Sequence, residues 1–280
     1  MSEDAALTLH CSPRSYKMAQ KDKTCFKHGE LKLLAKEFNK QSAKKIKIGP
    51  KKKMVNDLLK SFQGVCSDNQ YCWIKQIIKD VGKKVELEKA FRPEKPTTWK
   101  MDRHTWLNTY DILYVMKQYE ELYKDFVFLN VVPRDFASRE NGTCIGDMLC
   151  DFDVRKLDKK RFGIVFNTDD SHHGGMHWNA LFCNLDNKKV NYGVYFYDSV
   201  GDKAMPEVRA FMKKIVDQVG DKDFEMKENK IQKQFGNSEC GMFSIVFLTQ
   251  CLKNIKFDLI CKRMPTDAEI NRIRDVLFTS

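Results

Sequence analysis

Cys240 is the residue whose position in the chain most favours nucleophilic chemistry. It stands in "GNSECGMFSIVFLTQC" (236–251), where a small polar turn meets an apolar run that predicts a buried helix. A thiol at a helix N-terminus faces unpaired N–H groups and the positive end of the helix dipole, and both favour the thiolate. Gly241 lets a substrate backbone approach the sulfur closely, and Asn237 and Ser238 are available as helix caps. The alternative is that Cys240 is one more buried thiol.

A nucleophilic thiolate needs a base, and His177 is the best placed of the six histidines. It opens a predicted strand directly after the glycine-containing loop of "DDSHHGGMHWNALF" (169–182). Asp198 ends the next predicted strand, so its carboxylate can meet the ring and fix its tautomer. Asn184 and Asp186 are nearer in sequence, but they belong to the far end of the strand that His177 opens.

Two neighbours of the cysteine bear on the same chemistry. The oxyanion of an acyl-transfer intermediate needs two hydrogen-bond donors, and the backbone N–H of Cys240 is a natural first one. The side-chain amide of Gln234, six residues upstream, is the candidate for the second; its spacing alone equally fits a solvated surface residue. Glu239 opposes thiolate formation unless its side chain points away from the sulfur.

Zinc binding is an alternative for the histidine cluster, because His172, His173 and His177 form an HHxxxH pattern that a cysteine would complete. No second cluster with metal-ligand spacing accompanies it. We therefore expect neither a metal nor another cofactor, and we expect His172 and His173 to be solvated loop residues.

The ten cysteines are scattered without a C-x-x-C pair or an even framework. A chain of 280 residues does not need disulfides to fold, so we expect most of these thiols to be reduced and buried. Cys66 and Cys72, like Cys144 and Cys150, are six residues apart, which is not a usual spacing for zinc ligands.

The elements that must position these residues predict an α+β fold. Helical and strand patterns are mixed along the second part of the chain, which favours a mixed, mostly antiparallel sheet packed between helices, with Cys240 at the N-terminus of a central buried helix. The strand patterns cover 126–132, 162–167, 177–185 and 192–198, and the helical patterns cover 107–123, 206–219, 240–255 and 266–278.

The net charge of +11 lies entirely in the first third of the chain. Residues 1–95 hold 22 Lys and Arg against 11 Asp and Glu, whereas residues 96–280 hold 27 of each. Helical patterns occur at 28–39, 53–63 and 70–80, and "FRPEKPTTW" (91–99) is a polar, proline-containing boundary. We predict a basic helical accessory domain over 1–95 and a catalytic domain over 96–280.

The densest basic stretch is "KQSAKKIKIGPKKK" (40–53). Clustered lysines favour nucleic-acid binding because they displace counterions from a polyanion. A solvated basic face on a helical domain and a nuclear address are the alternatives. The candidate nucleic-acid-binding residues are Lys44, Lys45, Lys47, Lys51, Lys52 and Lys53.

Taken together, the motifs resemble the SUMO-protease/adenain superfamily of cysteine proteases. The chain order His177, Asp198, Gln234, Cys240 is that of the family and the reverse of papain's, where cysteine precedes histidine. "HW", "YDS" and Q-x5-C-G carry the resemblance, and "TWLNTYDI" (105–112) is similar to the family's segment leading into a helix. The resemblance covers about residues 96–280.

This resemblance implies roles for individual residues. Cys240 would be the nucleophile, His177 the general base and then acid, Asp198 the residue that orients the ring, and Gln234 with the Cys240 amide the oxyanion hole. It also implies that Trp106 and Trp178 form a narrow tunnel for a substrate's Gly-Gly end, since two indole faces leave room only for residues without side chains.

Within the superfamily, "FGIVFNTDDS", "HWNALF" and "WLNTYDILYVMKQYEELYKDFVF" look like proteases of large nucleocytoplasmic DNA viruses, which cleave virion polyproteins at Gly-Gly-x sites. The resemblance implies viral precursor proteins as substrates. The alternatives are a protease that removes SUMO-like or ubiquitin-like proteins from lysine, and an inactive nucleic-acid-binding scaffold.

No basic-then-apolar leader and no uninterrupted apolar stretch of about 18 residues occurs in the sequence. We therefore expect no membrane partner and no secretion. The expected locations are the virion interior and the host cytoplasm.

Overall fold

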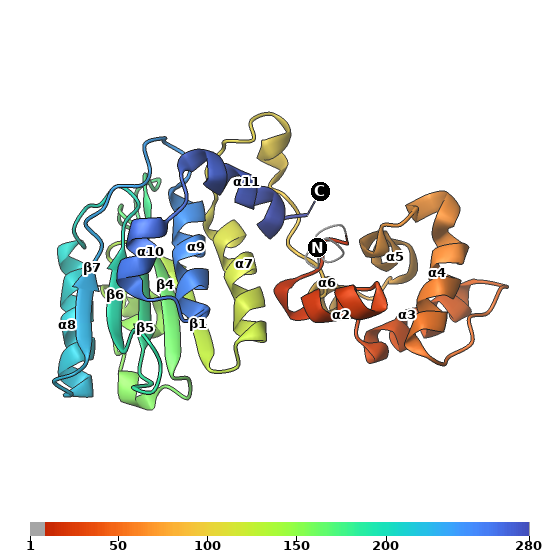
Figure 1. The fold of residues 1–280 in the computed structure, drawn as a ribbon, viewed down its shortest axis with the longest axis horizontal. Coiled ribbons are helices and arrows are strands. Elements are labelled where there is room, and N and C mark those ends of the chain that lie inside the picture. The colour runs from red at the N-terminus through yellow and green to blue at the C-terminus, as the bar shows by residue number, and fades with distance from the viewer. Residues whose placement is uncertain (1–8, 280) are drawn as a thin grey trace. The chain divides into compact units, whose positions relative to one another are not determined.

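The computed structural model describes residues 9–279. The chain forms two compact units, one made of residues 9–94 with 276–279 and the other of residues 95–275 (Figure 1). The sequence predicted that the second unit would run to residue 280. Residues 276–279 instead group with the first unit, where the N–H of Thr279 donates to the carbonyl of Pro93 at 2.8 Å.

The first unit is helical. Its helices pack around buried aromatic rings, with the ring centroid of Phe26 at 6.2 Å from that of Trp73 and 5.1 Å from that of Phe91. The three helices expected here are present, and two short ones were not foreseen from their weak apolar patterns. The helices are α2 (Tyr16–Asp22), α3 (His28–Gln41), α4 (Lys51–Cys66), α5 (Gln70–Ile77) and α6 (Val81–Glu88).

The second unit is built on a mixed sheet in the order β1-β4-β5-β6-β7. The pairings β4–β5 and β5–β6 are antiparallel, whereas β1–β4 and β6–β7 are parallel. The predicted α+β class and mixed sheet are confirmed, with as many parallel as antiparallel pairings where mostly antiparallel ones had been expected. The strands are β1 (Phe126–Val132), β4 (Arg161–Asn167), β5 (Trp178–Asn184), β6 (Gly193–Tyr197) and β7 (Glu225–Glu228), beside a separate pair, β2 (Arg139–Glu140) and β3 (Thr143–Cys144).

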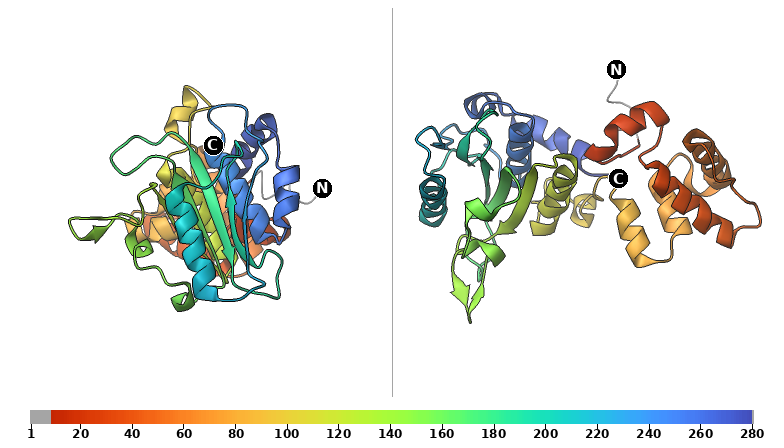
Figure 2. Two further views of the ribbon diagram at one scale, coloured as in Figure 1. Left: turned by 90° about the vertical axis from the view of Figure 1, so that its left-hand side faces the viewer. Right: turned by 90° about the horizontal axis from the view of Figure 1, so that it is seen from below.

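Helices cover both faces of this sheet (Figures 1 and 2). On one face, Phe211 of α8 packs edge to face against Phe136 with a ring separation of 5.4 Å. On the other, Phe247 of α9 stacks on Tyr197 at 4.9 Å. The central strands are therefore buried on both sides, which explains their continuous apolar sequence. The helices are α7 (Thr109–Leu122), α8 (Pro206–Val219), α9 (Cys240–Leu252), α10 (Phe257–Arg263) and α11 (Asp267–Leu277).

The helix α9 lies at the centre of the second unit. Every residue of its thirteen except Gln250 is buried, as the apolar sequence predicted. The helix ends at Leu252 rather than continuing to 255, and α10 follows as a separate element. Within residues 9–279, the helices are too short or too polar for any to cross a bilayer.

The structure corrects the expectation that most cysteines are reduced, because six of the ten form disulfides. The two pairs six residues apart close because the chain reverses between them, at the turn from α4 to α5 and at the 3-10 helix Asp147–Leu149 that follows β3. The bonds join Cys11 to Cys25, Cys66 to Cys72, and Cys144 to Cys150, and the free thiols are Cys183, Cys240, Cys251 and Cys261.

Candidate active site

Cys240 is the first residue of α9, and only 1% of its surface is exposed. Glu239 is the N-cap residue, and no side chain within residues 9–279 caps the first N–H groups of this helix. The prediction that Asn237 or Ser238 would cap it was therefore wrong. Free N–H groups and the helix dipole both favour a negative charge on the sulfur.

The imidazole of His177 lies between a carboxylate and this thiol. Its Nε2 is 2.8 Å from Oδ2 of Asp198. The two residues meet because β5 and β6 are antiparallel, so the start of one strand lies beside the end of the other. The thiol of Cys240 is near enough to the ring to raise its pKa. Since Nε2 is engaged by Asp198, Nδ1 is the nitrogen left for the sulfur.

The surroundings of His177 favour its charged form. Burial acts to lower the pKa of the ring, but hydrogen bonds and charges from Asp198 and Cys240 raise that pKa to about 10. The carboxylate is itself fixed, because its Oδ1 accepts from the N–H of Val200 at 2.8 Å. At neutral pH the ring can therefore be an imidazolium.

Glu239 is buried next to the nucleophile, yet its carboxylate is held by its own partners. Its Oε1 accepts from Asn271 Nδ2 at 2.9 Å and from Ser238 Oγ at 2.8 Å. Burial acts to raise the pKa of Glu239, but hydrogen bonds from Asn271 and Ser238 and the charge of Arg274 lower it overall. The residue is thus a carboxylate whose charge is balanced by an arginine.

Gln234 is buried, with 3% of its surface exposed, rather than solvated. Its Oε1 accepts from the hydroxyl of Ser199 at 2.7 Å, and its Nε2 donates to the carbonyl of Gly236 at 2.8 Å. A primary amide carries two N–H groups, so this arrangement fixes the side chain and still leaves one donor. Ser199 follows Asp198 directly, which ties the amide to the strand end that carries the carboxylate.

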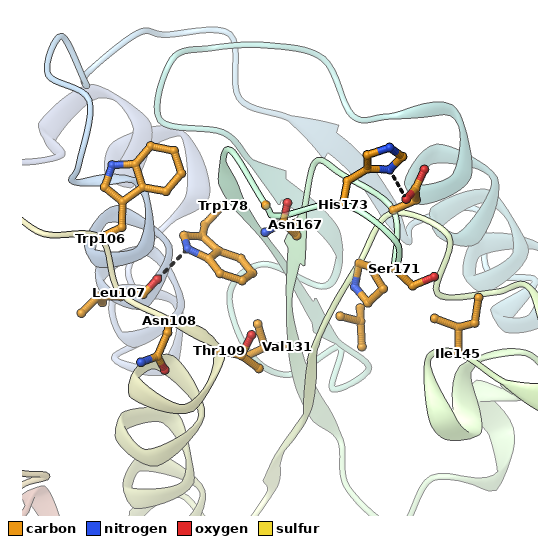
Figure 3. A pocket seen from close by; sticks show the side chains of 14 residues that line it. Trp106, Leu107, Asn108, Thr109, Val131, Ile145, Asn167, Ser171, His173 and Trp178 are labelled. Atoms are coloured by element: carbon orange, nitrogen blue, oxygen red, sulfur yellow. Dashed lines mark hydrogen bonds and ion pairs between the residues drawn. The ribbon is translucent and has the colours of Figure 1, made fainter. Parts of the chain in front are cut away.

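A pocket of about 590 Å³ is lined by the two predicted tunnel residues, Trp106 and Trp178. Trp106 and Trp178 lie at one end of it, and Ser171 and His173 lie at the other (Figure 3). Trp178 follows His177 in sequence, and its Nε1 donates to the carbonyl of Leu107 at 2.9 Å. The groove formed by this pocket therefore includes both tryptophans, and Trp178 connects it in sequence to His177.

No protein-family model matches the chain. A protein of Acanthamoeba polyphaga mimivirus that is named as a thiol protease is 27% identical over 96% of this chain and 92% of its own length. A "SUMO-1 cysteine protease" of African swine fever virus is 28% identical over 42% of this chain and 43% of its own length. The chain is a cysteine-type peptidase.

The fold of the peptidase is that of a solved viral protease. A crystal structure of the selenomethionine form of the African swine fever virus protease matches 97% of this chain and 96% of that chain, with a TM-score of 0.66 at 18% identity. A second crystal structure of that viral protease covers 80% of this chain and 89% of that chain, with a TM-score of 0.62 at 20% identity. The likeness in fold therefore extends over both units.

Gly241 has a packing role in the peptidase. A Cβ at this position would lie 3.2 Å from Cβ of Leu107 and 3.3 Å from Cδ1 of Trp178. The glycine therefore lets the first turn of α9 approach the segment that carries the tryptophans. Its expected contact with a substrate backbone stays a prediction.

The three histidines of the 169–182 segment do not face one another. The Nδ1 of His173 is 2.6 Å from Asp170, and the Nε2 of His172 is 3.9 Å from Glu140, while His177 faces Asp198. Within residues 9–279 no group of three or more His, Cys, Asp or Glu side chains is arranged to hold a metal ion. Each of the three histidines therefore lies beside a different carboxylate.

The six candidate lysines of the first unit differ in their surroundings. Lys51 forms an ion pair with Asp22 at 2.8 Å, and Lys45 donates to the carbonyl of Ser42 at the end of α3, also at 2.8 Å. Both are therefore partly engaged within the unit. The other four, which are exposed to solvent, are Lys44, Lys47, Lys52 and Lys53.

The sequence did not reveal three residues that form hydrogen bonds to the candidate catalytic residues or to the turn before Cys240: Ser199, Asn271 and Arg274. Ser199 was visible in "YDS", but its bond to Gln234 depends on the irregular chain after β7. Asn271 and Arg274 lie in a helix that had been predicted only as an element. Their spacing of three residues signalled a shared helix face, yet the sequence did not reveal which segment that face contacts.

Proposed function

We propose that the peptidase is an endopeptidase that cleaves after Gly-Gly in viral precursor proteins, with Cys240 as nucleophile. The observation that carries this proposal is the position of His177, held at 2.8 Å by Asp198 and near enough to the thiol at the N-terminus of α9 for that thiol to raise the pKa of the ring. Cysteine-peptidase chemistry needs a nucleophile, a base and a group that orients the base, and Cys240, His177 and Asp198 are the candidates for these roles.

In the first step the thiolate of Cys240 attacks the scissile carbonyl, and the carbonyl oxygen becomes an oxyanion. The N–H of Cys240 and the remaining amide N–H of Gln234 donate to that oxygen. The C–N bond then breaks as the imidazolium of His177 gives its proton to the leaving amine. Water, deprotonated by His177, finally hydrolyses the thioester and releases the carboxylate product and the thiol.

The groove supports the choice of glycine next to the scissile bond. Trp106 and Trp178 line one end of it, and Trp178 lies 3.3 Å from the position that a Cβ on Gly241 would take, closer than ordinary van der Waals contact. Indole faces at that end favour a substrate segment without side chains. In this proposal, the rest of the groove accommodates the residues that precede the glycines.

Viral precursor proteins are the proposed substrates, because the relatives carry protease names and come from viruses. As part of the same proposal, the peptidase acts in the virion interior and the host cytoplasm. Fractionating infected cells and purified virions with an antibody to the peptidase tests this location, and its recovery only from culture medium would contradict it.

The substrate proposal is tested with two fluorogenic peptides that differ only in Gly-Gly-x against Ala-Ala-x. We expect cleavage after the second glycine, located by mass spectrometry, and cleavage of the alanine peptide about 10- to 100-fold slower, because each added methyl must enter the narrow end of the groove. Equal rates for the two peptides would contradict the proposed specificity.

Removal of a SUMO-like protein from lysine is the second candidate function. It is favoured by the name of the African swine fever virus relative, "SUMO-1 cysteine protease". A SUMO–fluorophore fusion assayed beside the Gly-Gly-x peptide separates the two. Efficient release from the fusion with a slow peptide reaction would favour deconjugation, whereas the reverse supports precursor cleavage.

We also propose that the first unit binds nucleic acid through its exposed lysines. Lys52 and Lys53 stand in the first turn of α4, where no acidic residue is present. Positive charges at the positive end of a helix dipole are unfavourable. A bound phosphate would offset the charge of the lysines and that of the helix end. The exposed Lys44 and Lys47 extend the same charge along the preceding segment.

A further inference from the structure

The helix α11 presents three polar side chains to the turn that precedes the nucleophile. Asp267, Asn271 and Arg274 are spaced four and three residues apart, so they share one helix face. The Oδ2 of Asp267 accepts from the N–H of Phe235 at 2.9 Å and from that of Gly236 at 3.0 Å. The start of the helix thus fixes the start of the turn.

The next two residues of this face fix the end of the turn. Asn271 donates from Nδ2 to Glu239 at 2.9 Å, and Arg274 donates from Nη2 to the carbonyl of Ser238 at 3.0 Å. Arg274 also donates from Nε to the Oδ1 of Asn271 at 2.9 Å. The asparagine therefore connects the guanidinium to the carboxylate of Glu239.

Arg274 reaches a second segment of the site. Its Nη1 donates to the carbonyl of Thr105 at 3.0 Å, directly before the tryptophan that lines the groove. The guanidinium carbon lies 4.7 Å from the ring centroid of Trp99, and the whole residue is fully buried. The planar guanidinium group of Arg274 thus connects the segment of Trp106 to the turn before Cys240.

The charge of this arginine has a chemical consequence. Glu239 is a buried carboxylate one residue before the thiol, and a negative charge so close disfavours a thiolate. Arg274 is the buried cation that acts on both Glu239 and Cys240. Its positive charge offsets the carboxylate in surroundings where water screens little.

We propose that Arg274 is a positioning residue for the nucleophile. It holds the turn before Cys240 and the Trp106 segment in one arrangement, and its charge offsets that of Glu239 so that the thiolate persists at neutral pH. This inference rests on the proposed role of Cys240 and adds a residue outside the Cys-His-Asp set.

Other charged groups face this network, and the same experiment takes them into account. The Nδ1 of His104 is 3.9 Å from Glu239, and Asp267 lies beside the same turn. Arg103 and Asp102 also act on Arg274, with opposite signs. All profiles are therefore measured in a His104→Gln background, so that this exposed histidine does not contribute to the midpoints.

The test follows the rate of Cys240 alkylation by iodoacetamide against pH, resolved by peptide mass spectrometry. Arg274→Met should move the midpoint of the profile up by about one pH unit, and Glu239→Gln should move it down by about the same amount. The double variant should return close to the original midpoint. Arg272→Met, the same change at an exposed position of the same helix, should leave the midpoint unmoved.

Arg274→Lys separates charge from geometry. A lysine retains the charge but not the planar fork, so the midpoint should stay near that of the unaltered peptidase while kcat/KM falls about tenfold. If Arg274→Met does not fold, the Glu239→Gln variant tests the proposal instead. A midpoint of Cys240 alkylation that is not lower in Glu239→Gln than in the unaltered peptidase would then overturn the proposal. A lysine variant with full kcat/KM would likewise overturn the bridging role.

The outcomes distinguish this inference from the proposed function. If Cys240→Ala retains peptidase activity, Cys240 is not the nucleophile and both proposals are wrong. If Cys240→Ala is inactive but the Glu239 and Arg274 variants keep the midpoint of the unaltered peptidase, only the role of Arg274 is wrong.

Discussion

Charged side chains are arranged differently in the two units of the chain. In the second unit, the charged groups nearest Cys240 are largely shielded from water and held by hydrogen bonds, as His177 is by Asp198 and Glu239 is by Asn271. In the first unit, Lys52 and its exposed neighbours face solvent. Fixed, buried charges control protonation at one atom, whereas exposed charges of one sign attract a polyanion over a longer range. If both proposals hold, substitutions should separate bond cleavage from nucleic-acid binding.

The largest expected effect is the loss of the nucleophile. Cys240→Ala should lower kcat/KM for the Gly-Gly-x peptide by about 10⁴-fold or more and leave nucleic-acid affinity unchanged, because the first unit is untouched. Cys261→Ala is the matched control, since burial raises the pKa of that thiol to about 12 and keeps it protonated. Loss of nucleic-acid binding in Cys240→Ala would show that the two activities are not separable.

The second effect concerns the carboxylate. Asp198→Asn should lower kcat by about 10³- to 10⁴-fold, because the amide neither stabilises the imidazolium nor selects its tautomer. Circular dichroism of the variant serves as the folding control. Activity within about threefold of the original would contradict the orienting role of Asp198.

The pH dependence follows from the same pair. The pKa of His177 is raised from 6.5 to about 10 in the folded chain, so this group adds stability that is complete below pH 6.5 and is lost as pH rises through about 10. The alkaline limb of activity should therefore lie near pH 10 and move toward lower pH in Asp198→Asn. Initial rates between pH 6 and 11 measure this, and an alkaline limb near pH 7 in the unaltered peptidase would contradict it.

An intermediate effect is expected at the oxyanion hole. Gln234→Ala should lower kcat by about 10²-fold with little change in KM, because the donor acts on charge that develops only in the transition state. Gln250→Ala, on the one residue of α9 that is not buried, is the matched control. A rise in KM at constant kcat would assign Gln234 to substrate binding instead.

The smallest effect on cleavage is expected in the first unit. Changing Lys47, Lys52 and Lys53 to Gln should lower the slope of log affinity for DNA against log salt by about 3, one for each phosphate contact, and change peptide cleavage less than about twofold. The matched control changes three lysines already paired with glutamates: Lys75, Lys83 and Lys89. Equal slopes in the two triple variants would contradict a specific lysine surface.

Much of the second unit could be predicted from sequence because its patterns are strong. The apolar runs of the central strands and of α9 gave the right elements, and the order of the strands brought His177 to Asp198. The parallel edge strand β7 was missed because "EMKE" carries charges and has two exposed residues. A charged edge strand avoids pairing with other chains, and for the same reason it lacks an apolar signal.

The residues that fix the nucleophile turn were harder to predict. Asp267, Asn271 and Arg274 contact residues about 30 positions away, and nothing local in the sequence shows which turn their helix face meets. The cap assignment failed for a related reason, since Ser238 donates to Glu239 instead of accepting from α9. Short polar segments are ordered by tertiary contacts, so their own sequence carries little information.

The central claim is that the sulfur of Cys240 forms the covalent intermediate. A Gly-Gly peptide aldehyde or vinyl sulfone incubated with the peptidase, followed by mass spectrometry of its peptides, tests this directly. We predict a single adduct on Cys240 that is lost in His177→Ala. An adduct on another cysteine, or peptide cleavage that continues without any adduct, would contradict the account.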